Sequence, residues 1–507
     1  MRTRATTTLA LSLALCAVSI RAQSVMSAHT LIEAEQQHGT SGTSIEPAST
    51  PVPMLMTQHG PWRLMLHSNA FAANTQQQAN SPRNRDAFFS TNWIMPMAQR
   101  NLGANGKGGE LTLRAMLSLE PATVGHRNYP LLFQQGETAY GAPIVDGQHP
   151  HDFIMELAAL YDLPLSHNTL LSFYAAPVGD PAIGPTAFPH RQSASEDPVA
   201  ALGHHQEDST HIAFNVLTGG LTYRFARIEL SGFHGGEPDE AHWHFQPSPN
   251  GLAIDSVSTR LTLSPTPDLT GQYSIAHIAS PESLYPGEDQ QRQTASIMYH
   301  HTFHPKPRHN PETPHQASKM SALTKAGAGA PHLDSEMWDA TESPGKPSTS
   351  TDTMNMQNMP GMNMSPTQQG SAPPMHMAPD PRTDLSTTFL WGRTRSLTDN
   401  SKENSYLAEA LLRFASTNYL WTRLENAGRS NELLLTPGTL LPPNFVELPI
   451  GHVAAYTLGY DHNLSLGPHL LAAPGAQFTL YRTPQALRQT YGSTPTGEVL
   501  FIRFRLR

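Results

Sequence analysis

The sequence predicts an all-β protein, an antiparallel transmembrane β-barrel of about sixteen strands with a disordered Met-, His- and Pro-rich insert. Three observations lead to this fold class. After the first residues, no stretch approaches about 18 continuous apolar residues, which argues against a membrane-spanning helix. The composition is 38% hydrophobic and 14% charged, with 44 Pro and 36 Gly, which favours short strands and turns. From Pro61 onward, segments of about ten residues alternate apolar and polar side chains.

Residues 1–22 have the features of a secretory signal peptide. Two arginines precede an apolar run from Leu9 to Ile20, which is too short to remain in a bilayer as a spanning helix. Cleavage would remove Cys16, the only cysteine, so the mature chain would offer Met, His, Asp and Glu as metal ligands. Residues 23–60 are expected to form a disordered N-terminal segment.

The strand pattern is clearest near the start and at the end of the predicted barrel, in residues 110–120 and 497–507. In a membrane barrel, the apolar face of such a strand meets lipid and the polar face lines the lumen. The first of these segments presents Leu111, Leu113, Ala115, Leu117 and Leu119 on one face and Thr112, Arg114, Met116 and Ser118 on the other. The last segment presents Leu500, Ile502, Phe504 and Leu506 on one face and Arg503 and Arg505 on the other.

The requirement for an even number of strands decides whether residues 151–163 are assigned as a helix or as a strand. Residues 151–163 are rich in Leu, Ala, Met and Glu and look helical, yet bacterial barrels have an even number of strands joined alternately by short turns and long loops. Counting 151–163 as a strand restores both rules. The predicted strands are 61–72, 85–97, 110–120, 151–163, 168–176, 209–223, 227–234, 252–263, 268–278, 292–303, 384–396, 404–414, 417–427, 452–465, 469–483 and 497–507.

The barrel is therefore expected in two parts, residues 61–303 and 384–507, separated by an insert at 304–383. By parity, this insert lies on the periplasmic side. Its thioethers are soft ligands that suit Cu(I), so we expect it to bind copper, the alternatives being an inert linker or a docking segment for a periplasmic metal-handling partner. The expected ligands are Met354, Met356, Met359, Met362, Met364, Met375, His376 and Met377.

A second group of metal-ligand types falls in the predicted outer loops. Imidazole and carboxylate together suit Zn(II), Cu(II) or Ni(II). Loop packing through hydrogen bonds is the competing interpretation. The candidate ligands with the closest spacing are His204, His205, His242 and His244.

Charged residues of both signs are predicted to face the lumen. Such residues tune selectivity in an open channel, or they pair and plug it, and a long connection such as 177–208 could fold inward. The predicted pore-lining residues are Arg114, Glu229, Arg260, Glu409, Arg413, Arg503 and Arg505.

The architecture resembles a porin-like outer-membrane β-barrel of Gram-negative type over roughly residues 61–507 apart from the insert, and the methionine motifs resemble those of outer-membrane copper-resistance B proteins. The resemblance implies a protein in contact with outer-membrane lipid that serves transport or copper handling. The net charge of -9 gives no basic surface for nucleic acid. A general diffusion porin with an incidental insert is the main alternative.

A surface hydrolase is the second alternative, because Asp208, Ser209 and His211 supply a carboxylate, a hydroxyl and an imidazole. In a strand, however, Ser209 and His211 would share one face and Asp208 the other. No Gly-x-Ser-x-Gly elbow surrounds Ser209. The chain is therefore not expected to be an enzyme.

Overall fold

The structure is a computed structural model, and the chain divides into one unit of residues 1–305 with 379–507 and a second of residues 306–378. The signal peptide (1–22) and almost all of the insert (304–382) lie outside the described part. No helix among the described residues is long and apolar enough to span a membrane. The structure describes residues 28–103, 108–125, 128–208, 213–238, 240–244, 254–303 and 383–506.

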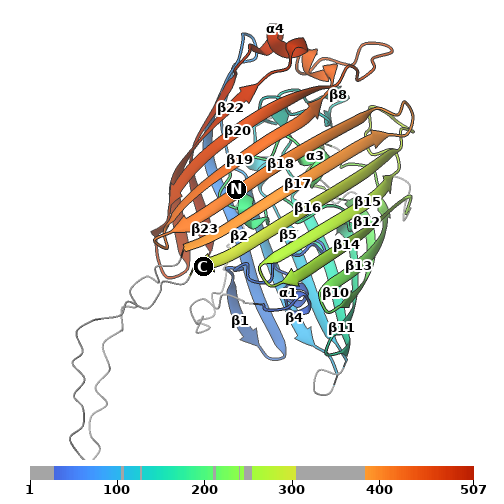
Figure 1. The fold of residues 1–507 in the computed structure, drawn as a ribbon, viewed down its shortest axis with the longest axis vertical. Helices are drawn as coiled ribbons and strands as arrows, with labels where there is room; N and C mark the ends of the chain where they lie inside the picture. Colours follow the sequence, from blue (N-terminus) through green and yellow to red (C-terminus); the bar gives the residue numbers. More distant parts are fainter. Residues whose placement is uncertain are drawn as a thin grey trace, which may run out of the picture. The chain divides into compact units, whose positions relative to one another are not determined.

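Sixteen antiparallel strands form a closed barrel, as the sequence predicts (Figure 1). The first and last strands close it, with Asn69 paired to Arg505 and Gln78 to Thr496. The barrel strands are β2 (Trp62–Gln78), β4 (Asn92–Asn101), β5 (Glu110–Leu117), β10 (Ile154–Ser166), β11 (Thr169–Gly179), β12 (Ala213–Tyr223), β13 (Ala226–His234), β14 (Ser256–Thr266), β15 (Leu269–Ile278), β16 (Gln290–Phe303), β17 (Thr383–Ser396), β18 (Lys402–Phe414), β19 (Asn418–Arg429), β20 (Gly451–His462), β22 (Leu470–Arg482) and β23 (Thr496–Leu506).

Short strands extend the barrel or fold within its loops. β1 (Leu55–His59) and β3 (Arg85–Phe89) pair with β2, and β21 (Leu464–Ser465) pairs with β22. The connection between β5 and β10 holds two small ladders, β6 (Tyr129–Pro130) with β9 (Gly147–Gln148) and β7 (Thr138–Ala139) with β8 (Ala142–Pro143). The short helices are α1 (Leu31–Gln37), α2 (Glu120–Thr123), α3 (His204–Glu207) and α4 (Arg488–Tyr491).

The segment with helical composition is a strand. β10 pairs with β5 on one side and with β11 on the other, with Tyr161 opposite Leu111 and Phe173. Two neighbouring strands supply backbone partners along its length, and this pairing outweighs the helix propensity of Leu, Ala and Glu. The parity argument is therefore confirmed for residues 154–163, whereas residues 151–153 belong to the preceding loop.

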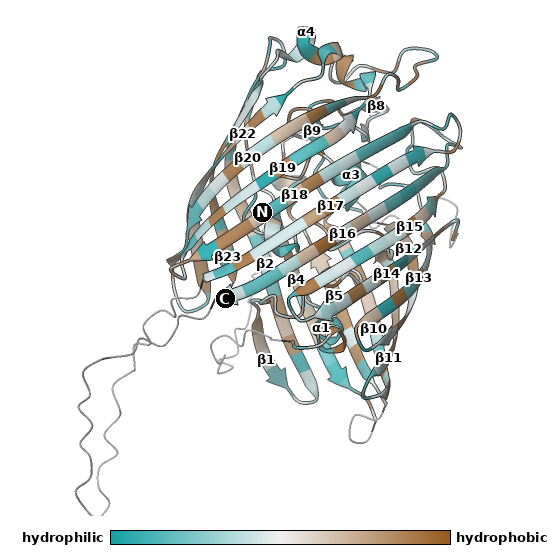
Figure 2. Cartoon of the chain, in the orientation of Figure 1, coloured by the Kyte–Doolittle hydropathy of each residue, from teal (hydrophilic) through white to brown (hydrophobic). Residues whose placement is uncertain are grey.

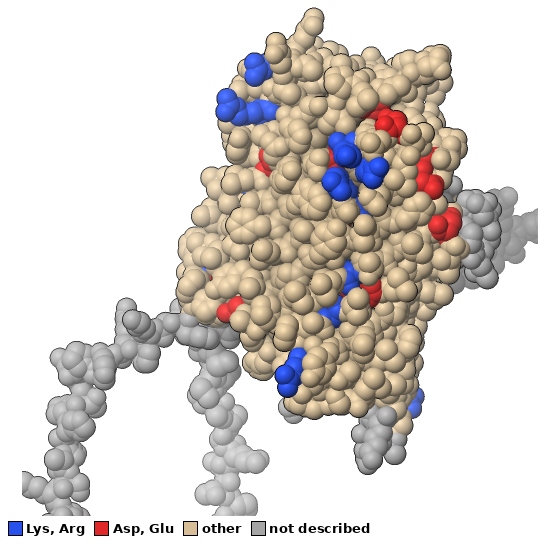
Figure 3. Space-filling view, turned by 45° about the vertical axis from the view of Figure 1, so that its right-hand side comes forward, with Lys and Arg blue, Asp and Glu red and all other residues tan. Residues whose placement is uncertain are grey.

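The two faces of the wall differ as a membrane barrel requires. On β5, Leu113 is 45% exposed on the outside while Arg114 is 2% exposed on the inside. On β23, Leu500 and Ile502 face outward and Arg503 lies fully buried. Figure 2 shows apolar positions alternating with polar ones along the strands, and Figure 3 shows few charged side chains on the face it presents. An outer surface of this kind is solvated by lipid hydrocarbon, which is the arrangement of an outer-membrane barrel.

The connections are asymmetric. One end carries short turns, such as 167–168 between β10 and β11 and 224–225 between β12 and β13, while the other carries long loops, including 118–153 and 180–212. β16 ends at Phe303 and β17 begins at Thr383, both at the short-turn end. By the convention of bacterial barrels, this is the periplasmic end.

The N-terminal segment corrects the expectation of disorder for residues 23–60. From residue 28 to residue 54 it is ordered inside the barrel and includes α1 (Figure 1). Thr30 caps α1 by accepting a hydrogen bond from the backbone N–H of Glu33. The segment lacks a strand pattern because it forms its hydrogen bonds with side chains of the wall, and sequence periodicity does not report such partners.

Candidate functional site

The candidate site is the barrel interior together with its loop-covered mouth. Arg114 on β5 holds the N-terminal segment at the wall: its guanidinium donates to the backbone oxygen of Thr40 at 2.6 Å and to that of His38 at 3.2 Å. The same guanidinium pairs with Glu156 on β10, with Nε 2.7 Å from Oε2. One buried arginine thus connects two strands of the wall to the segment that fills the lumen.

A second set of wall residues holds the same segment from another side. Arg260 on β14 donates to Thr43 Oγ1 at 2.8 Å and pairs with Glu229 on β13 at 2.9 Å. Arg227 donates to the backbone oxygen of Thr43 at 2.8 Å and pairs with Glu35 of α1 at 3.0 Å. The strand residues predicted to line a pore here bind a segment that occupies it.

The long loop between β11 and β12 also folds into the barrel over residues 180–208. Glu409 on β18 accepts a hydrogen bond from Arg191 Nε at 2.9 Å and from Ser193 Oγ at 3.0 Å, and both donors belong to this loop. Glu409 also pairs with Arg423 on the next strand at 2.8 Å. The inward loop is thereby attached to β18 and β19.

The two arginines of the last strand hold a neighbouring part of the loop. Arg505 Nη1 pairs with Glu196 at 3.0 Å and its Nη2 donates to the backbone oxygen of Ser195 at 2.9 Å. Arg503 pairs with Glu196 from the adjacent inward position. Buried ion pairs of this kind resist rupture, since an arginine or carboxylate left alone in a low-dielectric interior is costly.

Arg413 is used differently from the other six predicted pore-lining residues. It pairs with Asp384 on the adjacent strand β17, within the wall. The pair borders a cavity of 390 Å³ that His300 and Pro51 also line. Because Asp384 follows the first residue of β17, this cavity lies at the short-turn end, beside the strand to which the insert is joined.

At the opposite end, histidines from separate loops converge. Glu137, in the loop between β5 and β10, accepts from His149 Nε2 at 2.6 Å and from His205 Nε2 at 2.8 Å. His242, from the loop between β13 and β14, lies with Nδ1 2.6 Å from Asp152 Oδ1, and its ring centroid is 6.2 Å from that of His149. Three loops therefore meet through imidazoles and carboxylates.

The remaining predicted mouth ligands occupy different positions. His204 Nδ1 lies 2.6 Å from Asp208 Oδ1 at the two ends of α3, and its ring centroid is 5.2 Å from that of His205. His244 is exposed on its loop. Sequence spacing indicated the pair His204–His205 and His242, whereas Glu137 gave no signal because it becomes a partner only when two distant loops fold together.

Electrostatics at the mouth favour ion pairing. Burial opposes a charge on His149, but Glu137 outweighs burial and raises the pKa of His149 to about 9. Burial likewise opposes ionisation of Glu137, yet His149 and His205 hold its pKa well below its ordinary value. In this state His149 and Glu137 form a charged pair within the loop 118–153, and Glu137 also joins this loop to His205 of the inward loop. The imidazoles and carboxylates of the mouth are also ligands that divalent transition metals accept.

A further group of ligand types lies where the N-terminal segment meets β5 and β10. One ligand atom each from His38, Glu110 and Asp162 falls within 4.8 Å of the others, and His38 Nε2 is 2.8 Å from Asp162 Oδ2. His38 follows α1 in a left-handed conformation, with φ of 48°, which directs the chain away from the helix axis. Sequence reasoning missed His38, because it placed residues 23–60 outside the fold.

Two sequence hypotheses fall outside the described residues. The insert ligands Met354 to Met377, with His376, belong to residues 304–382. Ser209 and His211 of the hydrolase hypothesis also lie in an undescribed stretch. Its third member, Asp208, is described, and it is engaged by Arg191 and His204. Burial opposes ionisation of Asp208, but the Arg191 guanidinium and the hydrogen bond from His204 hold its pKa well below the ordinary value.

No family model matches the sequence, and no curated protein matches it. Among solved structures, the chain is similar to OprB of Pseudomonas putida, with 8% identity and a TM-score of 0.41 over 87% of this chain and 94% of that one. It is also similar to OmpT, an outer membrane protein of Vibrio cholerae, with 5% identity and a TM-score of 0.40 over 89% and 99% of the two chains. OccAB4 of Acinetobacter baumannii gives 10% identity and a TM-score of 0.31 over 87% and 97%. Identities of this size concern the fold alone.

Proposed function

We propose that this protein is an outer-membrane transport barrel, closed at rest by its own N-terminal segment and inward loop, that handles copper. The proposal is based on what the inward-facing charged side chains of the wall bind. Arg114 and Arg260 bind the N-terminal segment, and Glu409 and Arg505 bind the inward loop. In a general diffusion porin, the inward-facing charged side chains line a water-filled channel. Here they bind segments that fill the lumen, which favours regulated passage over free diffusion.

The copper part of the proposal comes from ligand chemistry. The insert between β16 and β17 offers seven thioethers and an imidazole in the tract 354–377, a ligand set that suits Cu(I). It is joined to the barrel at the short-turn end. At the other end, the loops of the mouth bring together imidazoles and carboxylates, which attract divalent cations. These side chains belong to Glu137, His149, Asp152, His205 and His242. We propose that the barrel passes or delivers copper between these ends, and that the insert captures Cu(I).

Conductance across a planar bilayer tests the closed barrel. The complete protein is expected to conduct weakly, and a chain lacking residues 28–50 is expected to conduct strongly, because this deletion removes the segment that Arg114 and Arg260 hold in the lumen. A deletion of equal length within the insert, residues 320–342, is the control and should leave conductance low. Large conductance in the intact protein would support the general porin instead, and equally low conductance in all three chains would show that residues 28–50 do not close the barrel.

Competitive titration tests the insert. The full-length protein is titrated with Cu(I) against a chelator, beside a full-length variant in which the seven methionines of the tract become Leu. We expect the variant to bind fewer Cu(I) ions per chain, because Leu keeps the apolar bulk and removes the sulfur ligand. An unchanged number of bound ions would overturn the insert's role and leave the conductance result intact.

A further inference from the structure

Methionine is concentrated on one part of the inner wall. Eight methionines lie among the described residues, and seven of them form one cluster around Trp93. Four adjacent strands contribute Met65, Met95, Met97, Met116 and Met155, the N-terminal segment contributes Met54, and the partly buried Met56 packs against them. We call Met54, Met65, Met95, Met97, Met116 and Met155 the inner methionine cluster.

The strand register brings these thioethers together in pairs. Met65 on β2 is directly opposite Met97 on β4, and His67 is directly opposite Met95. Side chains that face each other across antiparallel strands have Cβ atoms about 5 Å apart, so the two sulfurs of such a pair can reach one ion. Met54 is fully buried against them. The ligand atoms therefore come both from the wall and from the segment that fills the lumen.

The composition of the cluster is unlike that of the rest of the interior. The three other large apolar clusters of this barrel consist of Phe, Tyr, Trp, Leu, Ile, Val and Ala, with no methionine among their buried residues. Packing a segment against the wall is thus achieved elsewhere without thioethers. Methionine is a flexible side chain that specifies packing poorly, so seven in one place point to the chemistry of sulfur.

Two histidines, His67 and His190, lie beside the inner methionine cluster and add imidazole ligands to its thioethers. The Trp93 ring centroid lies 4.7 Å from that of His67 and 4.3 Å from that of His190. His190 comes from the inward loop, is 9% exposed, and places Nε2 3.3 Å from Met116 Sδ. Its Nδ1 is buried and has no hydrogen-bond partner within the described part of the chain.

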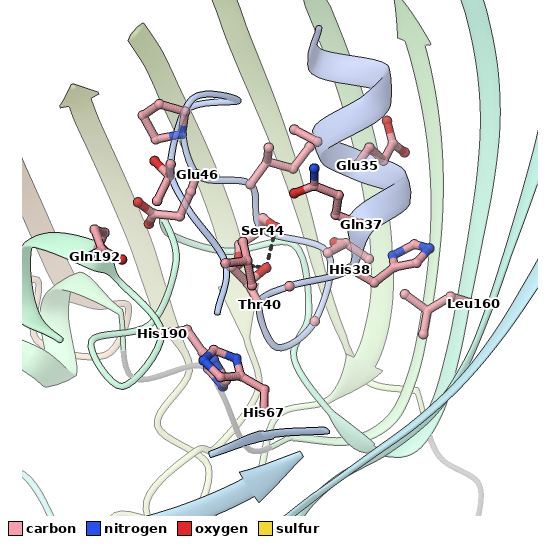
Figure 4. A pocket seen from close by; sticks show the side chains of 18 of the residues that line it. Glu35, Gln37, His38, Thr40, Ser44, Glu46, His67, Leu160, His190 and Gln192 are labelled. Atoms are coloured by element: carbon pink, nitrogen blue, oxygen red, sulfur yellow. Dashed lines mark hydrogen bonds between the residues drawn. The ribbon is translucent and has the colours of Figure 1, made fainter. Parts of the chain in front are cut away.

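The surroundings leave room beside these rings and balance the nearby charges. A cavity of 70 Å³ is lined by His67, Trp93 and His190 together with the N-terminal segment. Figure 4 shows the His67 and His190 side chains lying next to one another below this segment. Arg505, which lines this cavity, is paired with Glu196, and Arg114, which holds the N-terminal segment, is paired with Glu156, so both guanidinium charges are compensated.

We propose that the inner methionine cluster with His67 and His190 is a binding site for a soft monovalent cation, Cu(I) or Ag(I), inside the barrel. Thioethers and neutral imidazoles select such ions, and the absence of an unpaired carboxylate from these ligand residues disfavours hard cations. The site deepens the proposed copper handling without depending on the insert. Because Met54 belongs to the N-terminal segment, a bound ion also ties this segment to the wall.

Silver titration of the full-length protein tests the site. The background chain carries Leu in place of the seven methionines of the tract 354–377, so that the inner cluster is the methionine-rich site that remains. We expect it to bind one Ag(I) tightly, and the additional changes Met95→Leu, Met97→Leu and Met116→Leu to weaken this binding about tenfold or more, since metal affinity responds on this scale to lost ligand support. Met298→Leu, at a buried methionine on β16 outside the cluster, is the matched control and should not change binding.

Leu conserves volume, so the variants are expected to fold, which thermal unfolding checks. Should the triple variant fail to fold, His190→Gln in the same background replaces it and should weaken binding by a similar factor. X-ray absorption of the Cu(I) form should show sulfur and nitrogen ligands. Equal binding by the background and these variants, or a coordination shell of oxygen and nitrogen alone, would overturn the inner site. Neither result depends on conductance or on ion binding by the insert.

Discussion

Arg114 and Glu156 form a two-point ion pair across the adjacent strands β5 and β10, with Nε 2.7 Å from Oε2 and Nη2 2.8 Å from Oε1. Paired guanidinium and carboxylate groups have matching geometry, which fixes the orientation of the arginine. The remaining donors of Arg114 then point at the backbone of residues 38–42. A pair within the wall thus sets the position of the lumen-filling segment.

Arg114→Ala is expected to release the N-terminal segment. The change leaves Glu156 without its guanidinium partner and removes the donor to Thr40, a loss of about 3–5 kcal/mol for a buried ion pair. Faster hydrogen exchange in residues 31–42 and higher conductance should follow. Arg413→Ala, which removes a pair within the wall, should leave exchange in that segment unchanged. Equal effects of the two variants would contradict a specific role for Arg114.

Glu409→Gln is expected to loosen the inward loop. Two buried arginines, Arg191 of the loop and Arg423 of the wall, pair with this carboxylate, and neutralising it leaves both less well compensated. We expect a loss of about 3–5 kcal/mol in the free energy of unfolding, measured by urea titration in lipid. The exposed Asp86→Asn is the control for charge removal and should stay within about 0.5 kcal/mol of the unmodified protein.

The ion pair between His149 and Glu137 at the mouth of the barrel is expected to weaken at alkaline pH. Because Glu137 raises the pKa of His149 from 6.5 to about 9, the stabilisation from this pair is complete below about pH 6.5 and is lost as the pH rises through 9. Proteolysis of the loop 118–153, followed between pH 6.5 and 10, should accelerate across this window. A His149→Gln variant should be cleaved at a rate that lacks this pH dependence. An identical pH profile in both proteins would show that the His149–Glu137 pair does not stabilise this loop.

The barrel was predictable because a membrane imposes a period of two on every strand. Residues 151–163 illustrate the strength of this constraint: their composition favours a helix, yet the even strand count and alternating loop lengths place β10 where the structure has it. Inward and outward faces followed from the same alternation, as Leu113 and Arg114 show.

The contents of the barrel were not predictable from periodicity. Residues 28–54 are held by Arg114, Arg227 and Arg260, which lie on three strands far along the chain, so no local pattern reports their order. The same limit applies at the mouth, where Glu137 meets His205 across two loops. The inner methionine cluster was hidden for a third reason: its methionines are spread over four strands and the N-terminal segment, and only the folded register brings them together.

The methionine tract of the insert is expected to face the periplasm. β16 ends at Phe303 and β17 begins at Thr383, at the end of the barrel that carries the short turns. A protease added to intact cells should therefore leave residues 354–377 uncleaved, and the same protease should cut them once the outer membrane is opened. An epitope placed in the loop 430–450 at the opposite end is the control and should be accessible on intact cells. Cleavage of the tract on intact cells would reverse the orientation of the barrel and, with it, the side on which Cu(I) is captured.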